Sequence, residues 1–194
     1  MTRALVVGCS DDVWQEVEAA QKLASYDAFY LVKMAGIHWD QGRFSWVTLH
    51  PEFMDGYKTE RRKLGLPDCF ELVGPPEHEV GRHGHHHLDR RITYRWPGMT
   101  SSGASGLYAV KVALDDGHDR VVLAGVPMIR EAGHFARTRI WEQRDSFMPA
   151  WTAAKPHLKG KVRSMSGWTK EFLGEPTKEW LAEAALPGTL SPEG

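Results

Sequence analysis

The chain has 194 residues and a formal net charge of -1, and hydrophobic residues make up 42% of it. This length suits one domain with a real core, and the composition excludes a disordered chain. With 24 Lys and Arg against 25 Asp and Glu, nothing predicts nucleic-acid or membrane binding through bulk charge. We expect a single α/β domain over residues 1–186 and a flexible tail over 187–194.

The cysteines and the apolar runs indicate the compartment. Cys9 and Cys69 are far apart and neither belongs to a CxxC pair, so we expect free thiols and a reducing environment. The N-terminal apolar run is too short for a signal sequence, and no run approaches the roughly 18 apolar residues of a membrane span. We therefore expect a soluble, cytoplasmic protein without a membrane span.

The first 34 residues predict a strand, a turn, a helix and a second strand. Ala4–Val7 is an apolar run that stops at Gly8, and the helical spacing of apolar residues begins at Val13 and continues to Leu23. Ala28–Met34 is again apolar and typical of a strand. A βαβ pattern of this kind indicates a parallel sheet.

The same alternation continues along the chain. Further predicted strands are Phe44–Leu49, Cys69–Val73, Arg120–Val126 and Val162–Met165, and further predicted helices are Met54–Leu64, Leu107–Leu114, Phe147–Leu158 and Glu175–Ala185. The pattern predicts a Rossmann-like fold, an open and mainly parallel sheet with helices on both faces. Residues 74–91, rich in His, Arg, Gly and Pro, predict a long loop or local insertion.

A loop of small residues precedes the predicted helix at Leu107. Its candidate ligand-binding residues are Ser101, Ser102, Gly103, Ser105 and Gly106. Backbone N–H groups at a helix N-terminus bind anions, and small side chains do not obstruct a ligand. The loop does not end in the Gly-Lys-Ser/Thr of a phosphate-binding Walker motif, so a simple flexible turn is the alternative.

The turn after the first strand supplies a second candidate loop with Gly8, Ser10 and Asp11. Ligands of open parallel sheets bind at the carboxyl ends of the strands, where both loops are expected to lie. A nucleoside carrying one or two phosphates would span them. The turn lacks the GxGxxG spacing of a dinucleotide site, and an ordinary strand-to-helix turn is an equally good interpretation.

His50 and Glu52 follow another predicted strand and would face the same edge. His50 is a candidate acid or base, and Glu52 could orient it or hold a ribose hydroxyl. A locally packed histidine explains the pattern equally well.

Five histidines lie within residues 78–87, and among them His83 and His85 have the spacing of metal ligands. Imidazole groups suit Zn²⁺ or Ni²⁺. A solvated cationic lid over an anionic ligand is the alternative, because Arg82, Arg90 and Arg91 lie alongside.

A family resemblance rests on Gly8-x-Ser10 and on the later stretch SSGxSGLYAVKVALDDGxDRVVLAGV over residues 101–126. The combination resembles the superfamily of bacterial sialyltransferase-like glycosyltransferases and of proteins similar to an archaeal hydroxymethylpterin pyrophosphokinase. The resemblance implies a nucleotide or nucleotide-sugar ligand that contacts both loops, and a reaction that needs no metal. It also implies that Arg130 holds phosphate and that His134 serves as acid or base.

Pro127 departs from the family pattern, which has an acidic residue there. From the resemblance, the first interpretation is a nucleotide-binding transferase, most similar to a sialyltransferase-type glycosyltransferase. The alternative is a non-catalytic nucleotide-binding or regulatory protein, which Pro127 favours. A metal-dependent hydrolase that uses the residues from His83 to His87 is the third hypothesis.

Overall fold

The computed structural model describes residues 1–80, 86–131, 133–136 and 144–183. The strands are β1 (Arg3–Val7), β2 (Ala28–Val32), β3 (Ser45–Val47), β4 (Glu71–Gly74), β5 (Arg90–Arg91), β6 (Arg120–Ala124) and β7 (Val162–Ser164). The helices are α1 (Val13–Leu23), α2 (Ala35–His38), α3 (Met54–Lys63), α4 (Glu77–Val80), α5 (Ala104–Asp115), α6 (Arg144–Leu158), α7 (Gly167–Leu173) and α8 (Lys178–Ala182), with a 3-10 turn at Pro51–Phe53.

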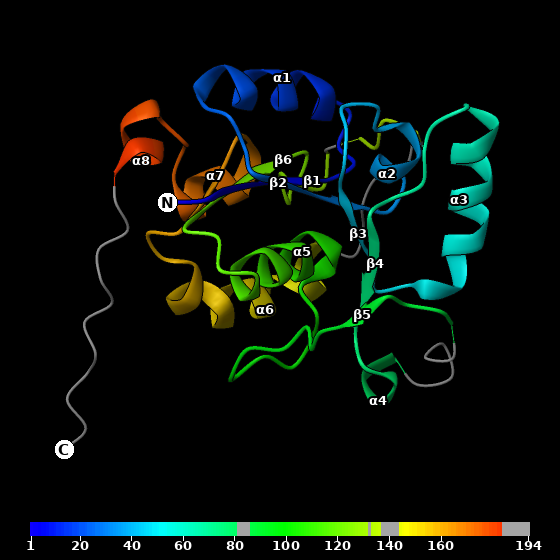
Figure 1. The fold of residues 1–194 in the computed structure, drawn as a ribbon. Coiled ribbons are helices and arrows are strands. Elements are labelled where there is room, and N and C mark those ends of the chain that lie inside the picture. Colours follow the sequence, from blue (N-terminus) through cyan, green and yellow to red (C-terminus); the bar gives the residue numbers. More distant parts are fainter. Residues whose placement is uncertain (81–85, 132, 137–143, 184–194) are drawn as a thin grey trace.

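The strands form one sheet of order β5-β4-β3-β2-β1-β6-β7, and every pair is parallel (Figure 1). The order reverses between β1 and β6, because β2 to β5 follow one another on one side of β1 and β6 and β7 lie on the other. In register, Val7 at the end of β1 pairs with Ala124 at the end of β6. The predicted Rossmann-like α/β fold is confirmed.

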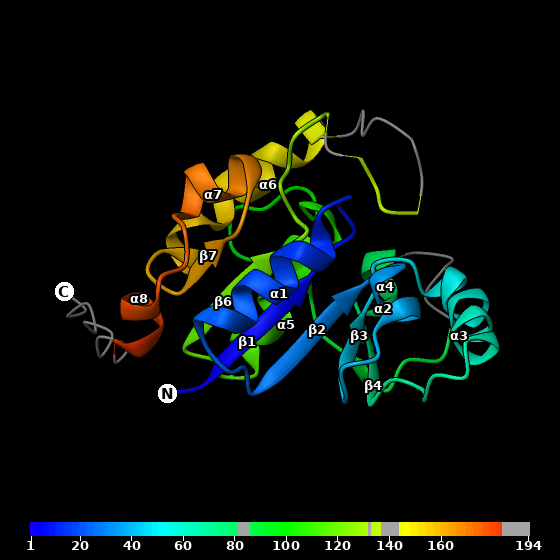
Figure 2. The same ribbon diagram turned by 90° about the horizontal axis from the view of Figure 1, so that it is seen from above.

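Alternate residues of the strands enter two separate cores. On one face Val6, Val32 and Leu123 pack with α5, α6 and α7. On the other face Leu5 and Leu31 pack with α1, α2, α3 and α8. Figure 2 shows α1 lying over β1, and α6 and α7 grouped beyond β7. Continuous apolar runs in β1 and β6 are thus explained, because helices cover both of their faces.

Several predicted elements need correction. Residues 74–91 are not a continuous loop: α4 and β5 lie within this range, and both are too short to show periodicity. Helix α5 begins at Ala104, so the last three residues of the predicted small-residue loop form its first turn. Helix α8 begins at Lys178 behind Thr177, whose hydroxyl accepts the N–H of Trp180. The helices α2 and α7 were not predicted.

Two further expectations concern the cysteines and the membrane. Cys9 and Cys69 are both free thiols, as predicted. In the described parts of the chain, no helix has both the length and the apolar character needed to cross a bilayer.

Candidate functional site at the carboxyl edge of the sheet

Two glycines join the ends of the central strands. The N–H groups of Cys9 and Ser10 both donate to the carbonyl of Gly125, at 3.0 and 3.2 Å. A Cβ atom on Gly8 would lie 2.1 Å from that carbonyl oxygen, so a side chain cannot be placed there. Gly125 itself has a φ of +72°, a conformation that glycine adopts without strain. The β1 turn and the β6 turn therefore form one continuous backbone surface.

Val126 connects this surface to the start of α5. A Cβ on Gly8 would approach Val126 Cγ2 to 2.7 Å, and a Cβ on Gly106 would approach Val126 Cγ1 to 2.6 Å. The indole N–H of Trp151 donates to the carbonyl of Gly103 at 2.8 Å and fixes the loop in front of α5. The two predicted ligand loops therefore meet at one valine.

Backbone strain in the described residues collects at the same edge. Lys33, Ala104 and Met128 are the residues other than glycine with positive φ, at 48°, 73° and 52°. Lys33 follows β2, Ala104 opens α5 and Met128 lies in the turn after β6. Strained non-glycine residues persist where the surroundings enforce them, and they cluster at functional sites.

The segment with His134 reaches the β1 turn. Ser10 and His134 form an isolated antiparallel bridge, and the N–H of Phe135 donates to the carbonyl of Cys9 at 3.2 Å. The ring of Phe135 packs against Trp14, with centroids 5.6 Å apart. This packing anchors the segment on α1, so two of the candidate residues from distant parts of the chain are adjacent.

Two serine hydroxyls of the predicted loops are buried and have no hydrogen-bond partner in the described part of the chain. Ser10 is 8% exposed, and its Oγ has no hydrogen-bond partner among the described residues. The Oγ of Ser101 is likewise buried and lacks a partner in the described structure. Buried hydroxyls are almost always hydrogen-bonded in proteins. Each of these two hydroxyl groups can therefore form a hydrogen bond with a ligand. Ser102 is half-buried and Ser105 is buried in the first turn of α5.

The histidines have different hydrogen-bonding roles. Nδ1 of His134 accepts the N–H of Ala136 at 3.1 Å, so the neutral ring carries its proton on Nε2 and can donate it. Nδ1 of His50 lies 3.0 Å from Oε1 of Glu52, so it donates to the carboxylate and leaves Nε2 as an acceptor. His50 and Glu52 thus form a base-like pair at the end of β3, two strands away from β1.

Charged residues predicted to bind ligand are partly engaged within the chain. Arg130 is ion-paired with Asp145 on α6, and Arg144 also contacts this carboxylate. The carboxylate of Asp11 lies against Gly133, where a Cβ would collide with it. Arg130 would have to leave Asp145 to hold a phosphate.

Sequence reasoning missed Glu16. This residue lies in the first turn of α1, and its carboxylate accepts the N–H of Gly125 at 2.7 Å. Burial raises the pKa of Glu16, against the lowering effect of the hydrogen bond from the Gly125 N–H. Its position at the start of the helix that follows the Gly8 loop was the available signal, because acidic residues in a first helical turn often bind nearby N–H groups.

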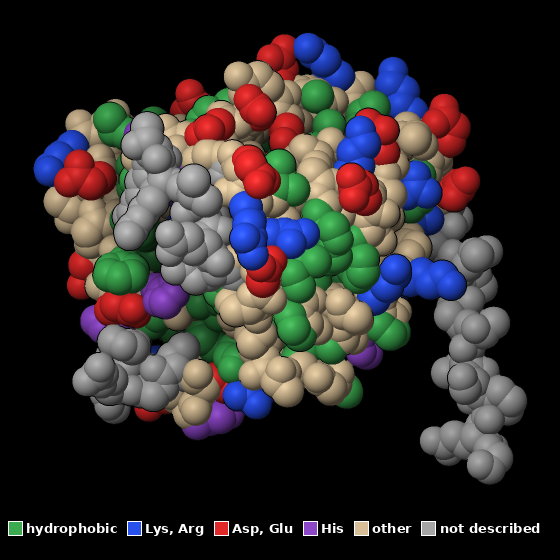
Figure 3. Space-filling model, turned by 180° about the vertical axis from the view of Figure 1, so that it is seen from behind, with side chains coloured by type: hydrophobic (Ala, Val, Ile, Leu, Met, Phe, Trp, Pro, Cys, Tyr) green, Lys and Arg blue, Asp and Glu red, His purple; other side chains and the backbone are tan. Residues whose placement is uncertain are grey.

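The predicted metal ligands His83 and His85 lie outside the described residues. Within the described ranges, no group of three His, Cys, Asp or Glu side chains could hold a metal ion. Over the coloured parts of Figure 3, acidic and basic side chains are interspersed, as the balanced charge predicts. This face therefore has no extended basic surface of the kind that binds nucleic acid.

A pocket of about 380 Å³ lies at the opposite edge of the sheet, near the start of β2, β3 and β4. It does not include any of the predicted site residues. The cleft expected at the carboxyl edge therefore stays a prediction, because this cavity lies at the other edge of the sheet.

Comparison with known proteins adds one finding. No protein-family model and no curated protein matches the sequence. The structure is similar to that of the sialyltransferase CST-II in complex with a trisaccharide acceptor and CMP, with a TM-score of 0.56. The chain shares its fold with a sialyltransferase. The similarity covers 91% of this chain and 87% of that chain at 10% sequence identity, so it shows the fold and not the reaction.

Proposed function

We propose that the chain binds a nucleotide or nucleotide-sugar at the carboxyl edge, between the β1 turn and the start of α5. The observation that carries this proposal is the buried hydroxyl of Ser10, which has no partner among the described residues, on the backbone bridge to His134 where the strand order reverses. Ligands of open α/β sheets bind at such a reversal. The strained residues at the same edge and the fold shared with a CMP-binding sialyltransferase support it.

In this proposal the phosphates lie between the two loops. The free N–H groups at the N-terminus of α5 and the hydroxyls of Ser10 and Ser101 would contact phosphate or ribose oxygens. Gly8 and Gly106 matter because side chains there would disturb the shared contact with Val126. Arg130 would exchange Asp145 for a phosphate oxygen.

The tautomers of His50 and His134 suggest which of them would act as base and which as acid in transfer from a nucleotide-sugar. The acceptor hydroxyl would attack the anomeric carbon, forming a new C–O bond while the bond to the phosphate oxygen breaks. The leaving nucleotide keeps the electron pair. His50, oriented by Glu52, would take the proton from the acceptor hydroxyl at Nε2, and His134 would donate its Nε2–H to the leaving phosphate. None of these steps uses a metal ion.

A second candidate function is nucleotide binding without catalysis. Pro127 supports it, because the family that the sequence resembles has an acidic residue at this position. Pro127 packs on Gly167, and its carbonyl accepts the N–H of Thr169 at 3.4 Å. This proline therefore stabilises the contact between the β6 turn and α7 and provides no carboxylate.

A thermal-shift panel with CMP, CDP, UDP, GDP and ATP tests binding. At least one nucleotide should raise the melting temperature, because a ligand that binds only the folded state stabilises it. A flat panel would contradict both candidate functions.

Hydrolysis of the nucleotide-sugar that corresponds to the best nucleotide separates enzyme from binder. If the chain is a transferase, slow release of free sugar should fall by about 10²-fold or more in His134→Ala and in His50→Ala. The matched control is His38→Ala, an exposed histidine that also packs near Phe135 but has no proposed role. Binding without any turnover would leave the non-catalytic function as the correct one.

A further inference from the structure

The pocket at the amino edge of the sheet has no role in the proposed function. It lies where β2, β3 and β4 begin and where α5 ends, so the whole sheet separates it from the Ser10 site. Its volume of about 380 Å³ falls within the range of small-molecule sites, roughly 300–1,000 Å³. Such a cavity can take one small ligand.

One side of the pocket is formed by an aromatic ring, Phe70, which is in contact with the guanidinium group of Arg43. The guanidinium carbon of Arg43 lies 3.2 Å from the ring centroid of Phe70. Phe70 is 57% exposed, which is unusual for a phenylalanine, and its N–H donates to the carbonyl of Phe44 at 2.9 Å. The backbone of Phe70 is thus held to the start of β3, and its exposed ring gives the pocket an apolar, aromatic wall that is in contact with Arg43.

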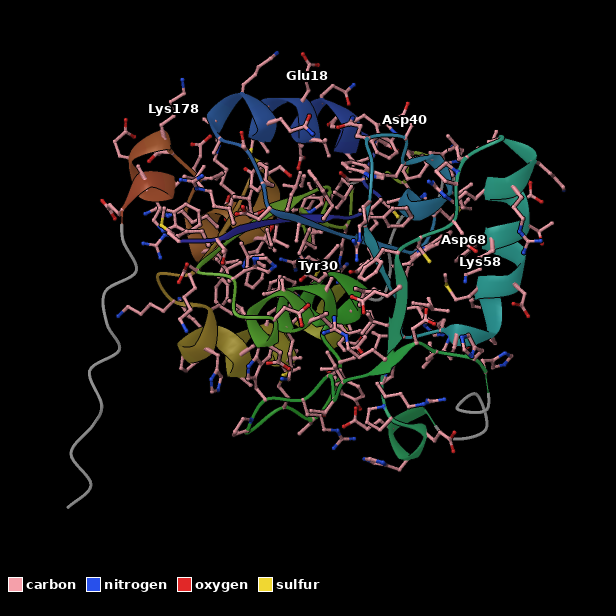
Figure 4. The ribbon with its side chains drawn as sticks, in the orientation of Figure 1. Glu18, Tyr30, Asp40, Lys58, Asp68 and Lys178 are labelled. Atoms are coloured by element: carbon pink, nitrogen blue, oxygen red, sulfur yellow. The ribbon has the colours of Figure 1, made fainter. Side chains whose placement is uncertain are left out.

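The other side is an ordered polar network beneath α5. Arg90 donates to both oxygens of Asp116, at 2.5 and 2.9 Å, and to Oε1 of Glu71 at 2.9 Å. Ser45 also donates to Oε1 of Glu71, at 2.7 Å. Tyr30, which Figure 4 shows between the sheet and α5, donates its hydroxyl to Asp116 at 2.7 Å.

The carboxylates of this network outnumber its guanidinium groups, so the network has a net negative charge. Two carboxylates share the single guanidinium of Arg90, and the exposed Asp27 is a third carboxylate of the lining. Burial would raise the pKa of Asp116, but hydrogen bonds from Arg90 and Tyr30 outweigh it and lower that pKa, so the group stays ionised. The carboxyl end of α5 adds partial negative charge.

Glu71 has room for another donor. The hydrogen bonds that the described residues make to Glu71 both end on Oε1, so Oε2 keeps its lone pairs. The side chain is 17% exposed, which is enough for a ligand to reach it and low enough to weaken competition from water.

We propose that this pocket binds a small organic cation, an amine on an aromatic or apolar body. Its ammonium group would pair with Glu71 Oε2, and its body would pack beside Phe44 and Phe70. An anion would be repelled by the excess of carboxylates, although Arg43 offers it one partner. The proposal does not depend on nucleotide binding at the other edge.

Calorimetric titration with 2-phenylethylammonium, phenylacetate and 2-phenylethanol tests this directly, because the three probes share a shape and differ in charge. The ammonium should bind with a dissociation constant below about 1 mM, and the other two at least about tenfold more weakly. Equal binding of the three probes would overturn the proposal. So would the absence of binding by the ammonium.

Variants locate the site. Glu71→Gln should weaken the ammonium by about tenfold or more, whereas Glu18→Gln, an exposed glutamate on α1, should not change it. Phe70→Ala changes an exposed side chain and should also weaken binding without loss of folding. Unchanged binding in both site variants would contradict the proposal. Nucleotide-induced thermal shifts should be the same in Glu71→Gln and wild type, so a failure here is distinct from a failure of the proposed function.

Discussion

Ser10 and His134 pair through their backbones in an antiparallel bridge, although one follows β1 and the other follows β6. The bridge brings together the backbones of two candidate site residues, Ser10, whose buried hydroxyl has no partner among the described residues, and His134, whose Nδ1 accepts the N–H of Ala136. An unpaired buried hydroxyl lowers the stability of the free protein. This cost would be removed if an oxygen atom of a bound ligand formed a hydrogen bond with the Ser10 hydroxyl.

The first prediction follows from that cost. Ser10→Ala should raise the free energy of unfolding of the ligand-free protein by about 1 kcal/mol, because it removes a buried polar group that has no partner in the described structure. The same change should reduce the nucleotide-induced thermal shift. Chemical denaturation with and without nucleotide measures both effects. Ser25→Ala, at an exposed position, is the control. A loss of stability in Ser10→Ala would show that the hydroxyl already has a partner.

The second prediction concerns the contact that unites the two loops. Gly106→Ala should destabilise the protein by about 2 kcal/mol, because the new Cβ would lie 2.6 Å from Val126 Cγ1. In a Val126→Ala background the same change should cost almost nothing, because the obstructing methyl group is gone. Urea denaturation of the four proteins gives the coupling energy.

Gly56→Ala provides the matched control for that cycle. Gly56 lies in α3, and a Cβ atom added there would meet no other atom within 4 Å, so alanine should stabilise the helix by up to about 1 kcal/mol. If Gly106→Ala behaved like Gly56→Ala, the close approach of α5 to Val126 would be refuted.

The third prediction concerns a buried cation. Arg61 is 1% exposed, and its guanidinium donates to the carbonyls of Gly36, Trp39 and Pro67 at 2.8, 2.6 and 2.5 Å. Arg61→Ala should cost about 3 kcal/mol, because these buried carbonyls lose their donor. Arg62→Ala, at the exposed neighbouring position, should cost less than about 0.5 kcal/mol in the same denaturation experiment. Equal effects would contradict this role of Arg61.

The fourth prediction is a pH dependence. Burial lowers the pKa of His118 below 6.5. If the buried Nδ1 took up a second proton, the new N–H would find no hydrogen-bond acceptor among the described residues. Between the two pKa values, His118 is therefore protonated in the unfolded chain and neutral in the folded chain. The free energy of unfolding is therefore greatest above about pH 6.5, falls as the pH drops from there to the lower pKa of the folded state, and levels off below it. His118→Asn should flatten this part of the stability profile, and an unchanged profile would exclude His118 as its source.

The sequence predicted which loops lie at one edge of the sheet better than it predicted the short local elements. Gly8 and Gly106 could be assigned to one edge because strands of a parallel sheet end together, and their shared contact with Val126 confirms this. The helix α2 and the strand β5 have four and two residues, too few to show a period. The buried role of Arg61 depends on the carbonyls of α2, which its own sequence neighbourhood does not reveal.

The pairing of residues across the chain was harder still. His134 was identified through a family resemblance, and its contact with Ser10 depends on how the turn after β6 folds back over α1. Glu16 was missed because its partner Gly125 directly follows β6, far away in sequence. These contacts follow from the strand order and not from local periodicity.

Amide hydrogen exchange with and without the nucleotide that gives the largest thermal shift tests the central claim most directly. We expect slower exchange in residues 8–11, 101–106 and 125–128, and no change where β2, β3 and β4 begin. Protection confined to the amino edge of the sheet, or absent from the Ser10 and Ser101 loops, would contradict a nucleotide site at the carboxyl edge.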